Sequence, residues 1–292
     1  MKIHLVDGTY ELFRNHFGAP PKQAPDGRQV GATLGLVRSL LMLLNTPGVT
    51  HVACAFDHVI ESFRNDLFAG YKTSASIDPD LLAQFPLAEE AVSDLGVVVW
   101  PMVESEADDA LATAVKCFKN HKTVEQIVIC SPDKDLAQLV SGQQIVCWDR
   151  RRDIIMNEAG VLEKFGVRPQ SIPDWLALVG DAADGYPGIP GWGAKSTAAV
   201  LSRFEHLESI PNDGGTWGLK TISAGRAASL ADSLAQRRDE ALLYRQLATL
   251  RNDVPLREKL SDLKWQGAHD HLIKFCRELG DERIPARISR WR

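Results

Sequence analysis

Four short apolar runs, each leading into acidic residues, constrain the fold of this chain more than any other feature. The runs cover residues 3–6, 52–56, 97–100 and 127–130, and they are rich in β-branched side chains. Such runs, separated by helical stretches, are typical of buried parallel strands. The sequence therefore predicts an α/β fold with a mostly parallel central sheet flanked by helices.

The acidic residues after these runs are expected to gather at one edge of the sheet. In an open α/β sheet the ligand site lies beyond the carboxyl ends of the strands. Like charges crowded there repel each other unless cations neutralise them. All the donors are oxygen atoms, which favours Mg²⁺, with Mn²⁺ as a substitute, over zinc. The pattern predicts a metal-dependent phosphodiesterase site made by Asp7, Asp57, Glu106, Asp108, Asp109, Asp133 and Asp135, with Asp181 and Asp184 from an adjoining loop.

Charge is unevenly distributed along the chain. The 292 residues carry 33 Lys+Arg and 38 Asp+Glu, a formal net charge of −5. Residues 1–146 contain 11 basic and 18 acidic side chains, whereas residues 147–292 contain 22 and 20. Because two-thirds of the basic side chains lie in the second half, the overall sign does not exclude DNA as a partner.

Cysteine usage and the N-terminus predict a cytoplasmic protein. The five cysteines are scattered and form no CxxC pair, which favours reduced thiols in the core. The chain enters the first predicted strand within three residues, so no signal peptide is expected. The most apolar stretch, residues 34–44, contains an arginine and is too short to span a bilayer. No membrane partner is expected.

The periodicity divides the chain into a predicted core over residues 1–168 and a helical subdomain over 169–292. Residues 58–96 contain no evident strand and are expected to form a helical arch above the sheet edge, including an acidic helix near 81–95. Ser105 and Ser131 are expected helix N-caps, the latter with Pro132 in the first turn. Further helices are expected over 33–44 and 106–118, with a pair of edge strands at 145–148 and 154–155.

A glycine-rich turn lies between two helical patterns, 172–179 and 195–204. This arrangement predicts a helix-hairpin-helix over about 171–204. Glycines allow positive φ and close approach, so backbone N–H groups at the start of the second helix can face a phosphate. The expected DNA-binding residues are Gly188, Gly191, Gly193, Lys195 and Ser196, and such contacts read the DNA backbone and not its sequence.

In order, these motifs resemble the bacterial 5′ nuclease family, which includes the 5′→3′ exonuclease domain of DNA polymerase I and the flap endonucleases. The resemblance covers roughly residues 1–255 and rests on Leu5–Thr9, Phe56-Asp57, Phe63-Arg64, Tyr71-Lys72, Glu106–Asp109, Asp133–Val140, Leu176–Asp181, the hairpin and Gln246–Leu250. It implies a PIN-like nuclease core with a helical arch. The chain stops where a polymerase would begin, so we expect a free-standing member.

The resemblance also implies roles for individual residues. Asp7, Asp57, Glu106 and Asp108 would serve one metal, with Asp108 shared, and Asp133, Asp135 and Asp184 a second, supported by Asp109 and Asp181. Lys72 would contact the scissile phosphate at the base of the arch. Arg64 and Tyr71 belong to the same region, as a catalytic and a DNA-binding residue. The hairpin would grip duplex DNA, with K⁺ between its carbonyls and a phosphate. The mechanism implied uses two cations about 4 Å apart.

Three positions depart from the family pattern. Thr73-Ser74-Ala75 follow the lysine where the family commonly has an arginine, Pro132 replaces a glycine, and Gly185 replaces an asparagine. None of these changes removes a metal ligand, so hydrolysis is expected.

The expected function is therefore a structure-specific 5′ nuclease of replication and repair, acting as a monomer on DNA with 5′ ends, flaps or junctions. Two alternatives stay open. A PIN-like ribonuclease shares the acidic edge, and a non-catalytic DNA-junction binding protein shares the scaffold. Faster cleavage of unstructured RNA would favour the first, and absence of Mg²⁺-dependent cleavage would favour the second.

Overall fold

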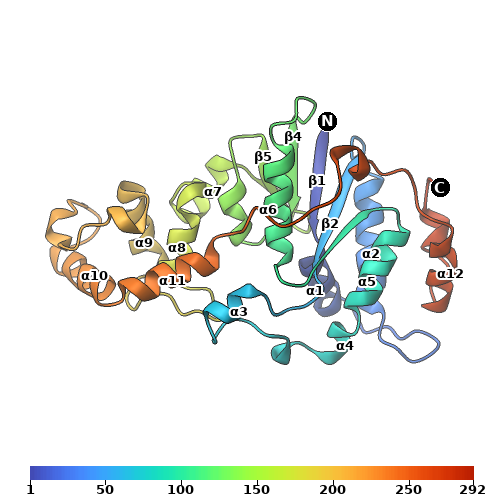
Figure 1. The fold of residues 1–292 in the computed structure, drawn as a ribbon, viewed down its shortest axis with the longest axis horizontal. Coiled ribbons are helices and arrows are strands. Elements are labelled where there is room, and N and C mark those ends of the chain that lie inside the picture. The colour runs from blue at the N-terminus through green and yellow to red at the C-terminus, as the bar shows by residue number, and fades with distance from the viewer. The chain divides into compact units, whose positions relative to one another are not determined.

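The computed structural model describes residues 1–292, which form two compact units. The first, here called the core unit, contains residues 1–62, 73–131 and 251–292. The second, here called the helical unit, contains residues 63–72 and 132–250. Figure 1 shows the helices and strands of both units. The division at residue 168 that we expected from the sequence stays a prediction.

A parallel sheet forms the centre of the core unit. Its strands are β1 (Lys2–Asp7), β2 (His51–Asp57), β3 (Val98–Met102) and β4 (Gln126–Cys130). They lie in the order β3-β2-β1-β4, and every neighbouring pair is parallel. All seven residues of β2 are buried, as expected for a strand covered on both faces. The predicted parallel sheet is confirmed.

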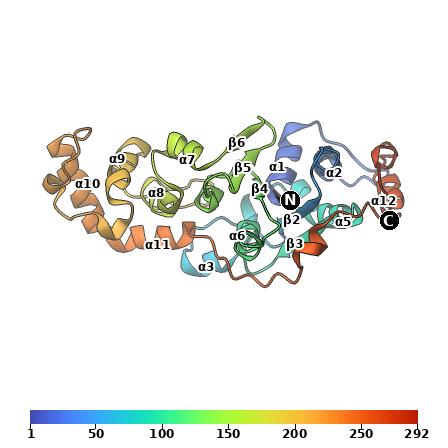
Figure 2. The ribbon, with the colours of Figure 1, turned by 90° about the horizontal axis from the view of Figure 1, so that it is seen from above.

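Helices cover both faces of this sheet. The helices of the core unit are α1 (Gly8–Gly18), α2 (Gly31–Leu44), α4 (Pro79–Leu82), α5 (Phe85–Asp94), α6 (Ala107–Phe118) and α12 (His271–Glu278). Helices α1, α5 and α6 contact the strands, and α12 packs on α5. The chain moves outward from β1 to β3 and then returns past β1 to β4, so right-handed crossovers place α2 and α6 on opposite faces (Figure 2). The strand order reverses beside β1, which is where α/β folds place their ligands.

The structure corrects two local expectations in the core unit. The helix expected near residues 81–95 above the sheet edge instead packs, as α5, against α2 and β3. Its residues Phe85, Ala88 and Val92 are buried, because α5 is the crossover helix between β2 and β3. Ser105 does not cap α6; Glu106 does, in a capping box with Asp109. The arch over the earlier part of this stretch stays a prediction.

Residues 251–292 return to the core unit and pack against the residues that precede β2 and follow α5. The backbone N–H of Trp265 donates to the Thr50 carbonyl (2.9 Å), and its indole N–H donates to the Leu95 carbonyl (2.8 Å). Gly96 has φ +81°, and a Cβ there would lie 2.0 Å from the Gly267 carbonyl oxygen. The returning segment is therefore packed backbone to backbone against the core.

Asp281 anchors this segment, and its replacement by asparagine is expected to destabilise the core unit. Asp281 is 2% exposed, and its carboxylate forms ion pairs with Lys22 (3.3 Å) and Arg38. Burial alone would raise the pKa of Asp281, but Arg38, the Arg283 N–H and Lys22 outweigh it and lower the pKa. Because Asp281→Asn loses the charge and one acceptor, we expect a loss of about 2 kcal/mol or more in urea unfolding at pH 7.

The contribution of Asp281 to the free energy of unfolding should depend on pH in a defined direction. A carboxyl group whose pKa is lower in the folded than in the unfolded chain stabilises the fold above its unfolded pKa, and this contribution is lost as the pH falls through the folded pKa. The difference between parent and Asp281→Asn should therefore shrink in acid. Asp270→Asn is the matched control, since Asp270 is exposed and makes no side-chain cap. A difference that persists unchanged in acid would contradict the charge-based account.

The helical unit contains one strand pair and six helices. Strands β5 (Ile145–Asp149) and β6 (Ile154–Met156) pair antiparallel, which confirms the predicted edge strands. Helix α3 (Phe63–Leu67) lies apart in sequence from the rest, which are α7 (Glu158–Phe165), α8 (Ile172–Val179), α9 (Ala194–Phe204), α10 (Ala224–Gln236) and α11 (Arg238–Ala248). Helices α8 and α9 pack together across the predicted hairpin, and α11 packs on α8. None of the helices has both the length and the apolar composition that a membrane span requires.

Short 3₁₀ helices complete the elements of both units. They cover Ser74–Ser76, Asp135–Leu139, Pro169–Ser171, Leu207–Ser209, Gly214–Thr216, Leu260–Leu263 and Pro285–Arg287.

Candidate functional site

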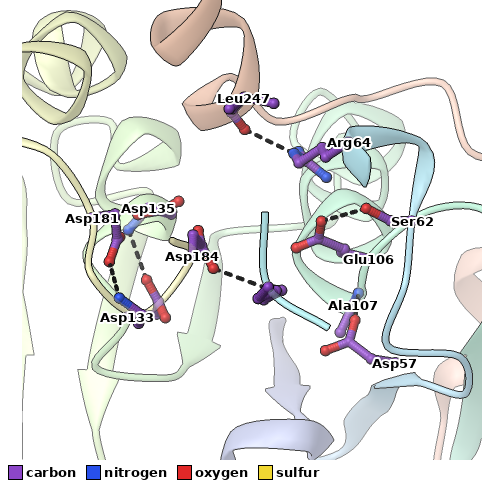
Figure 3. Close-up of polar contacts among 12 residues, drawn as sticks. Asp57, Ser62, Arg64, Glu106, Ala107, Asp133, Asp135, Asp181, Asp184 and Leu247 are labelled. Carbon is purple, nitrogen blue, oxygen red and sulfur yellow. Dashed lines mark hydrogen bonds and ion pairs between the residues drawn. The ribbon is translucent and has the colours of Figure 1, made fainter. Parts of the chain in front are cut away.

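In the core unit, Asp7 and Asp57 end neighbouring parallel strands and are both buried. Asp7 accepts the Tyr10 N–H (2.8 Å) as the N-cap of α1, and the Ser131 hydroxyl donates to its second oxygen (2.8 Å). Ser131, expected to cap a helix of its own, therefore binds across from β4 to β1. Asp57 accepts the Ala107 N–H (2.6 Å) at the start of α6 (Figure 3).

The start of α6 adds three carboxylates to the same unit. Glu106 is 4% exposed and accepts from the Ser62 hydroxyl (2.7 Å; Figure 3). Asp109 is fully buried and accepts backbone N–H groups of Glu106 (3.0 Å) and Arg251 (2.8 Å). Asp108 lies half-buried in the first turn. Asp109 thus fixes the backbone position of Glu106.

In the helical unit, three of the four expected carboxylates lie close together. One oxygen from each of Asp135, Asp181 and Asp184 lies within 4.8 Å of the others. Asp133 is exposed and accepts the Asp135 N–H (2.9 Å), so it orders the turn beside this group (Figure 3). Burial, followed by the charges of Asp133, Asp184 and Asp181, raises the pKa of Asp135 well above its usual value.

One oxygen of Asp135 has no hydrogen-bond partner although it is buried. An unpaired buried acceptor costs about 1–3 kcal/mol, and more when it is charged. Such a cost is tolerated at functional sites, where a ligand satisfies the group. The Asp135, Asp181 and Asp184 group is thus a candidate site for a divalent cation.

Two lysines already bind these carboxylates. Lys72 Nζ lies 3.1 Å from Asp184 and Lys134 Nζ lies 2.8 Å from Asp181. Burial would lower the pKa of Lys134, but Asp181 and then Asp135 and Asp133 outweigh it and raise the pKa. We did not single out Lys134 from the sequence, although its position between two candidate ligands could have suggested it.

The segment before Lys72 docks tightly on the loop that carries Asp184. The Lys72 N–H donates to the Asp184 carbonyl (3.0 Å), and Asn65 donates to the Lys72 carbonyl (3.0 Å). Gly185 has φ +89°, and a Cβ there would lie 2.1 Å from the Gly70 carbonyl oxygen. The departure of Gly185 from the family asparagine thus has a physical reason, since only glycine permits this approach.

Replacement of Gly185 by asparagine is expected to displace residues 70–72 and separate Lys72 from Asp184. The strained backbone and the clash should cost about 1–3 kcal/mol of stability in urea unfolding. Gly225→Ala is the matched control, because Gly225 has ordinary φ and nothing within 4 Å of a Cβ. That control should be neutral or slightly stabilising in α10. Equal stability of Gly185→Asn and parent would contradict the close approach.

Arg64 and Tyr71 lie in the interior of the helical unit, at 1% and 3% exposure. The Arg64 guanidinium donates to the carbonyls of Leu247 (2.7 Å; Figure 3) and Thr249 (3.3 Å), at the end of α11. These contacts tie α3 to α11, so they support a positioning role for Arg64 rather than direct contact with a phosphate. Burial of Tyr71 leaves Lys72 as the accessible residue of the pair.

The two other departures from the family pattern have local settings of their own. Ser74, which begins the turn after Lys72, donates its N–H (2.7 Å) and hydroxyl (2.6 Å) to Glu61. The segment where the family commonly has an arginine is thus an uncharged turn, Thr73-Ser74-Ala75, whose Ser74 is hydrogen-bonded to Glu61. Pro132 is half-buried between Ser131 and the Asp133 turn.

The glycine-rich hairpin has the geometry that the sequence predicts. Gly188 has φ +72°, and a Cβ there would lie 2.4 Å from the Gly180 nitrogen, so the two ends of the hairpin meet backbone to backbone. Gly193 is the N-cap of α9 and faces open space. Lys195 is exposed in the first turn, and Ser196 donates to the Gly193 carbonyl (3.2 Å). The N-terminus of α9 is therefore accessible to an anion.

Comparison with known proteins identifies the family. The model for the 5′-3′ exonuclease N-terminal resolvase-like domain matches residues 2–166, and the model for the 5′-3′ exonuclease C-terminal SAM fold matches residues 167–271. The chain belongs to the 5′-3′ exonuclease family. The predicted resemblance is confirmed, and the strand ends that carry the acidic residues lie within the first matched region.

Relatives in this family fall into two length classes. The 5′-3′ exonuclease of Buchnera aphidicola is 29% identical, with 89% of this chain and 90% of that protein covered. The 5′-3′ exonuclease of Aquifex aeolicus is 34% identical, with 71% of each covered. DNA polymerase I of Bacillus subtilis is 29% identical over 99% of this chain. The chain spans about a third of the length of that polymerase.

Solved structures show the same fold. A zinc-bound T5 5′-exonuclease has a TM-score of 0.69 at 16% identity, with 98% of this chain and 97% of that chain covered. The catalytic core of Rad2 in complex with a DNA substrate has a TM-score of 0.60 at 16% identity, with 98% and 90% covered. The 5′-3′ exonuclease fold therefore extends through both units.

Proposed function

We propose that this chain is a structure-specific 5′ nuclease that hydrolyses DNA phosphodiester bonds, both as a 5′→3′ exonuclease and on 5′ flaps. The group formed by Asp135, Asp181 and Asp184 carries the proposal, because its carboxylate oxygens converge within 4.8 Å and one is buried without a partner. Family membership supports the same reaction. A role in DNA replication and repair follows from these substrates.

The donor set fits a hard divalent cation. Only carboxylate oxygens converge in this group, which suits Mg²⁺ or Mn²⁺ better than softer ions. Asp135, Asp181 and Asp184, with Asp133, would hold one ion. Asp7, Asp57, Glu106 and Asp108 of the core unit would hold another, with Asp109 in support. Bound divalent ions would supply water activation and charge stabilisation at the leaving 3′-oxygen.

In this proposal one basic residue acts on the DNA phosphate and two others hold the site in position. Lys72 leaves Asp184 and neutralises charge on the scissile phosphate, where a positioned cation is most effective. Lys134 holds Asp181 in place, and Arg64 holds α3 on α11. We also infer a monomer in a reducing cytoplasm, in keeping with the five free cysteines, four of which are buried.

One assay separates this proposal from its alternatives. Purified protein with Mg²⁺ is given 5′-labelled flap, nicked, blunt duplex and single-stranded DNA, and a matched unstructured RNA. We expect cleavage of flap and nicked DNA that stops with EDTA. Faster cleavage of the RNA would indicate a PIN-like ribonuclease. Flap binding without cleavage of any substrate would indicate a non-catalytic junction binder.

The hairpin is expected to grip a duplex through its phosphates. Replacing Lys195 and Ser196 by alanine should weaken duplex binding, measured by fluorescence anisotropy in EDTA. It should also reduce the slope of log K against log salt by about 0.9, because one phosphate contact by a lysine is lost. Lys274→Ala serves as a control, since that exposed lysine pairs with Glu278 on α12. Equal slopes for variant and parent would contradict the hairpin contact.

A further inference from the structure

Two carbonyl groups of the hairpin accept hydrogen bonds from side chains of α10. The Gly191 carbonyl accepts a hydrogen bond from the Arg226 guanidinium. The Pro190 carbonyl accepts the Ser233 hydroxyl (2.7 Å), and the Ile189 carbonyl accepts the Trp192 N–H (3.0 Å). A monovalent cation at the Gly191 carbonyl would lie beside the positively charged guanidinium, and this like-charge contact disfavours its binding. The Arg226 contact therefore argues against K⁺ at the Gly191 carbonyl, where the guanidinium already supplies the positive charge.

Helix α10 presents one face to the hairpin. The Trp192 indole N–H donates to the Leu230 carbonyl (3.1 Å) and is buried there. Arg226, Leu230 and Ser233 are spaced by four and three residues, so they share a face of the helix. The Arg226 contact is thus part of a packed interface, and the Trp192 ring anchors it.

Arg226 carries a charge that no carboxylate balances. The guanidinium nitrogens lie 3.8 and 3.9 Å from the position that a Cβ would take on Gly191, which has φ +87°. Arg226 is exposed, and no Asp or Glu in the chain lies within salt-bridge distance of it. A guanidinium has five N–H donors, so donors remain free after the carbonyl contact.

We propose that Arg226 is a phosphate-binding residue of the hairpin and that its guanidinium takes the place of a monovalent cation there. Part of the guanidinium donates to the Gly191 carbonyl, and its remaining N–H donors can bind a DNA phosphate. The planar, multi-donor guanidinium suits phosphate binding well. The exposed Lys195 and the open N-terminus of α9 follow within four residues of Gly191. This inference rests on the proposed duplex binding and specifies the ion requirement of that same site.

The first test measures how the positive charge of Arg226 contributes to duplex DNA binding. Duplex DNA binding is followed by anisotropy in EDTA for the parent, Arg226→Gln and Arg226→Lys over a series of salt concentrations. Loss of one phosphate contact should lower the salt slope of Arg226→Gln by about 0.9, and lysine should restore most of it. Ser233→Ala removes the neighbouring hairpin contact without a charge, so its slope should equal that of the parent. Arg237→Gln is a control for an exposed arginine that pairs with Glu240.

The second test exchanges the ion. At equal ionic strength, the parent should bind duplex DNA equally well in KCl and NaCl, within about twofold. Arg226→Gln frees the Gly191 carbonyl, so binding by this variant should become tighter in KCl than in NaCl. A several-fold KCl preference of the parent that persists in Arg226→Gln would overturn the proposal. An unchanged salt slope in Arg226→Gln would overturn it as well.

These outcomes differ from failure of the proposed nuclease function. A parent that binds duplex DNA but does not cleave it would remove the nuclease and leave the Arg226 contact supported by its salt slope. A parent that does not bind duplex DNA at all would overturn both. Thermal unfolding of Arg226→Gln within 2 °C or so of the parent would exclude a folding defect as the cause of weaker binding.

Discussion

Asp135→Ala is expected to reduce Mg²⁺-dependent DNA cleavage by roughly 1,000-fold or more. The substitution removes the carboxylate around which the other acidic residues of the proposed metal site gather. The same change should leave duplex binding in EDTA near the parent value. It should also leave metal-free stability unchanged or raised, since Asp135 is buried beside Asp181 and Asp184 with one oxygen unpaired. Single-turnover cleavage and urea unfolding together measure these effects.

Two further measurements make the Asp135 result specific. Mg²⁺ should raise the unfolding midpoint of the parent through binding to the folded state, and this rise should be absent or smaller in the variant. Asp232→Ala, at an exposed position of α10, should leave cleavage and the Mg²⁺ effect unchanged. Normal turnover of Asp135→Ala in Mg²⁺ would refute the assignment of this group as a metal site.

Lys72→Ala is expected to lower the single-turnover cleavage rate by at least about tenfold, with a smaller change in DNA affinity. A cation positioned at a phosphate acts mainly on the charge that develops in the transition state. The variant also frees Asp184 from its 3.1 Å ion pair, so a divalent ion should bind more tightly in the absence of DNA. Mg²⁺ titration followed by thermal unfolding measures this second effect.

Lys220→Ala is the matched control for Lys72→Ala, because Lys220 is an exposed lysine outside the acidic group. An unchanged cleavage rate in Lys72→Ala would remove this lysine from the mechanism. A lower rate without tighter Mg²⁺ binding would show that the Asp184 ion pair does not compete with the metal.

The sequence predicts the sheet and the strand-end carboxylates well, for a physical reason. Parallel strands must end at a common edge, so Asp7 and Asp57 could be placed from local patterns alone. The convergence of Asp135 with Asp181 and Asp184 depends on the turn before Asp135 and on the end of α8. The spacing of the motifs indicates both features. These features are local or follow from the topology of the fold.

Other features depend on contacts between distant segments and could not be predicted. Arginine is rarely fully buried, so nothing in the sequence indicates that Arg64 ends against the carbonyls of α11. The need for glycine at position 185 comes from the Gly70 carbonyl, more than a hundred residues earlier. The position of α5 was predicted wrongly, because an acidic surface on a helix does not reveal that its other face covers a sheet.

The three-part construction of the core unit affects how the protein can be made. Two of its strands, β1 and β2, leave the ribosome long before residues 251–292, which supply Trp265, Gly267 and Asp281 to the same unit. During synthesis the N-terminal end of β2 therefore stays exposed while the helical unit emerges and folds. A nascent chain arrested before this last segment should thus be sensitive to proteases in its first sixty residues, and release of the last segment should bring resistance.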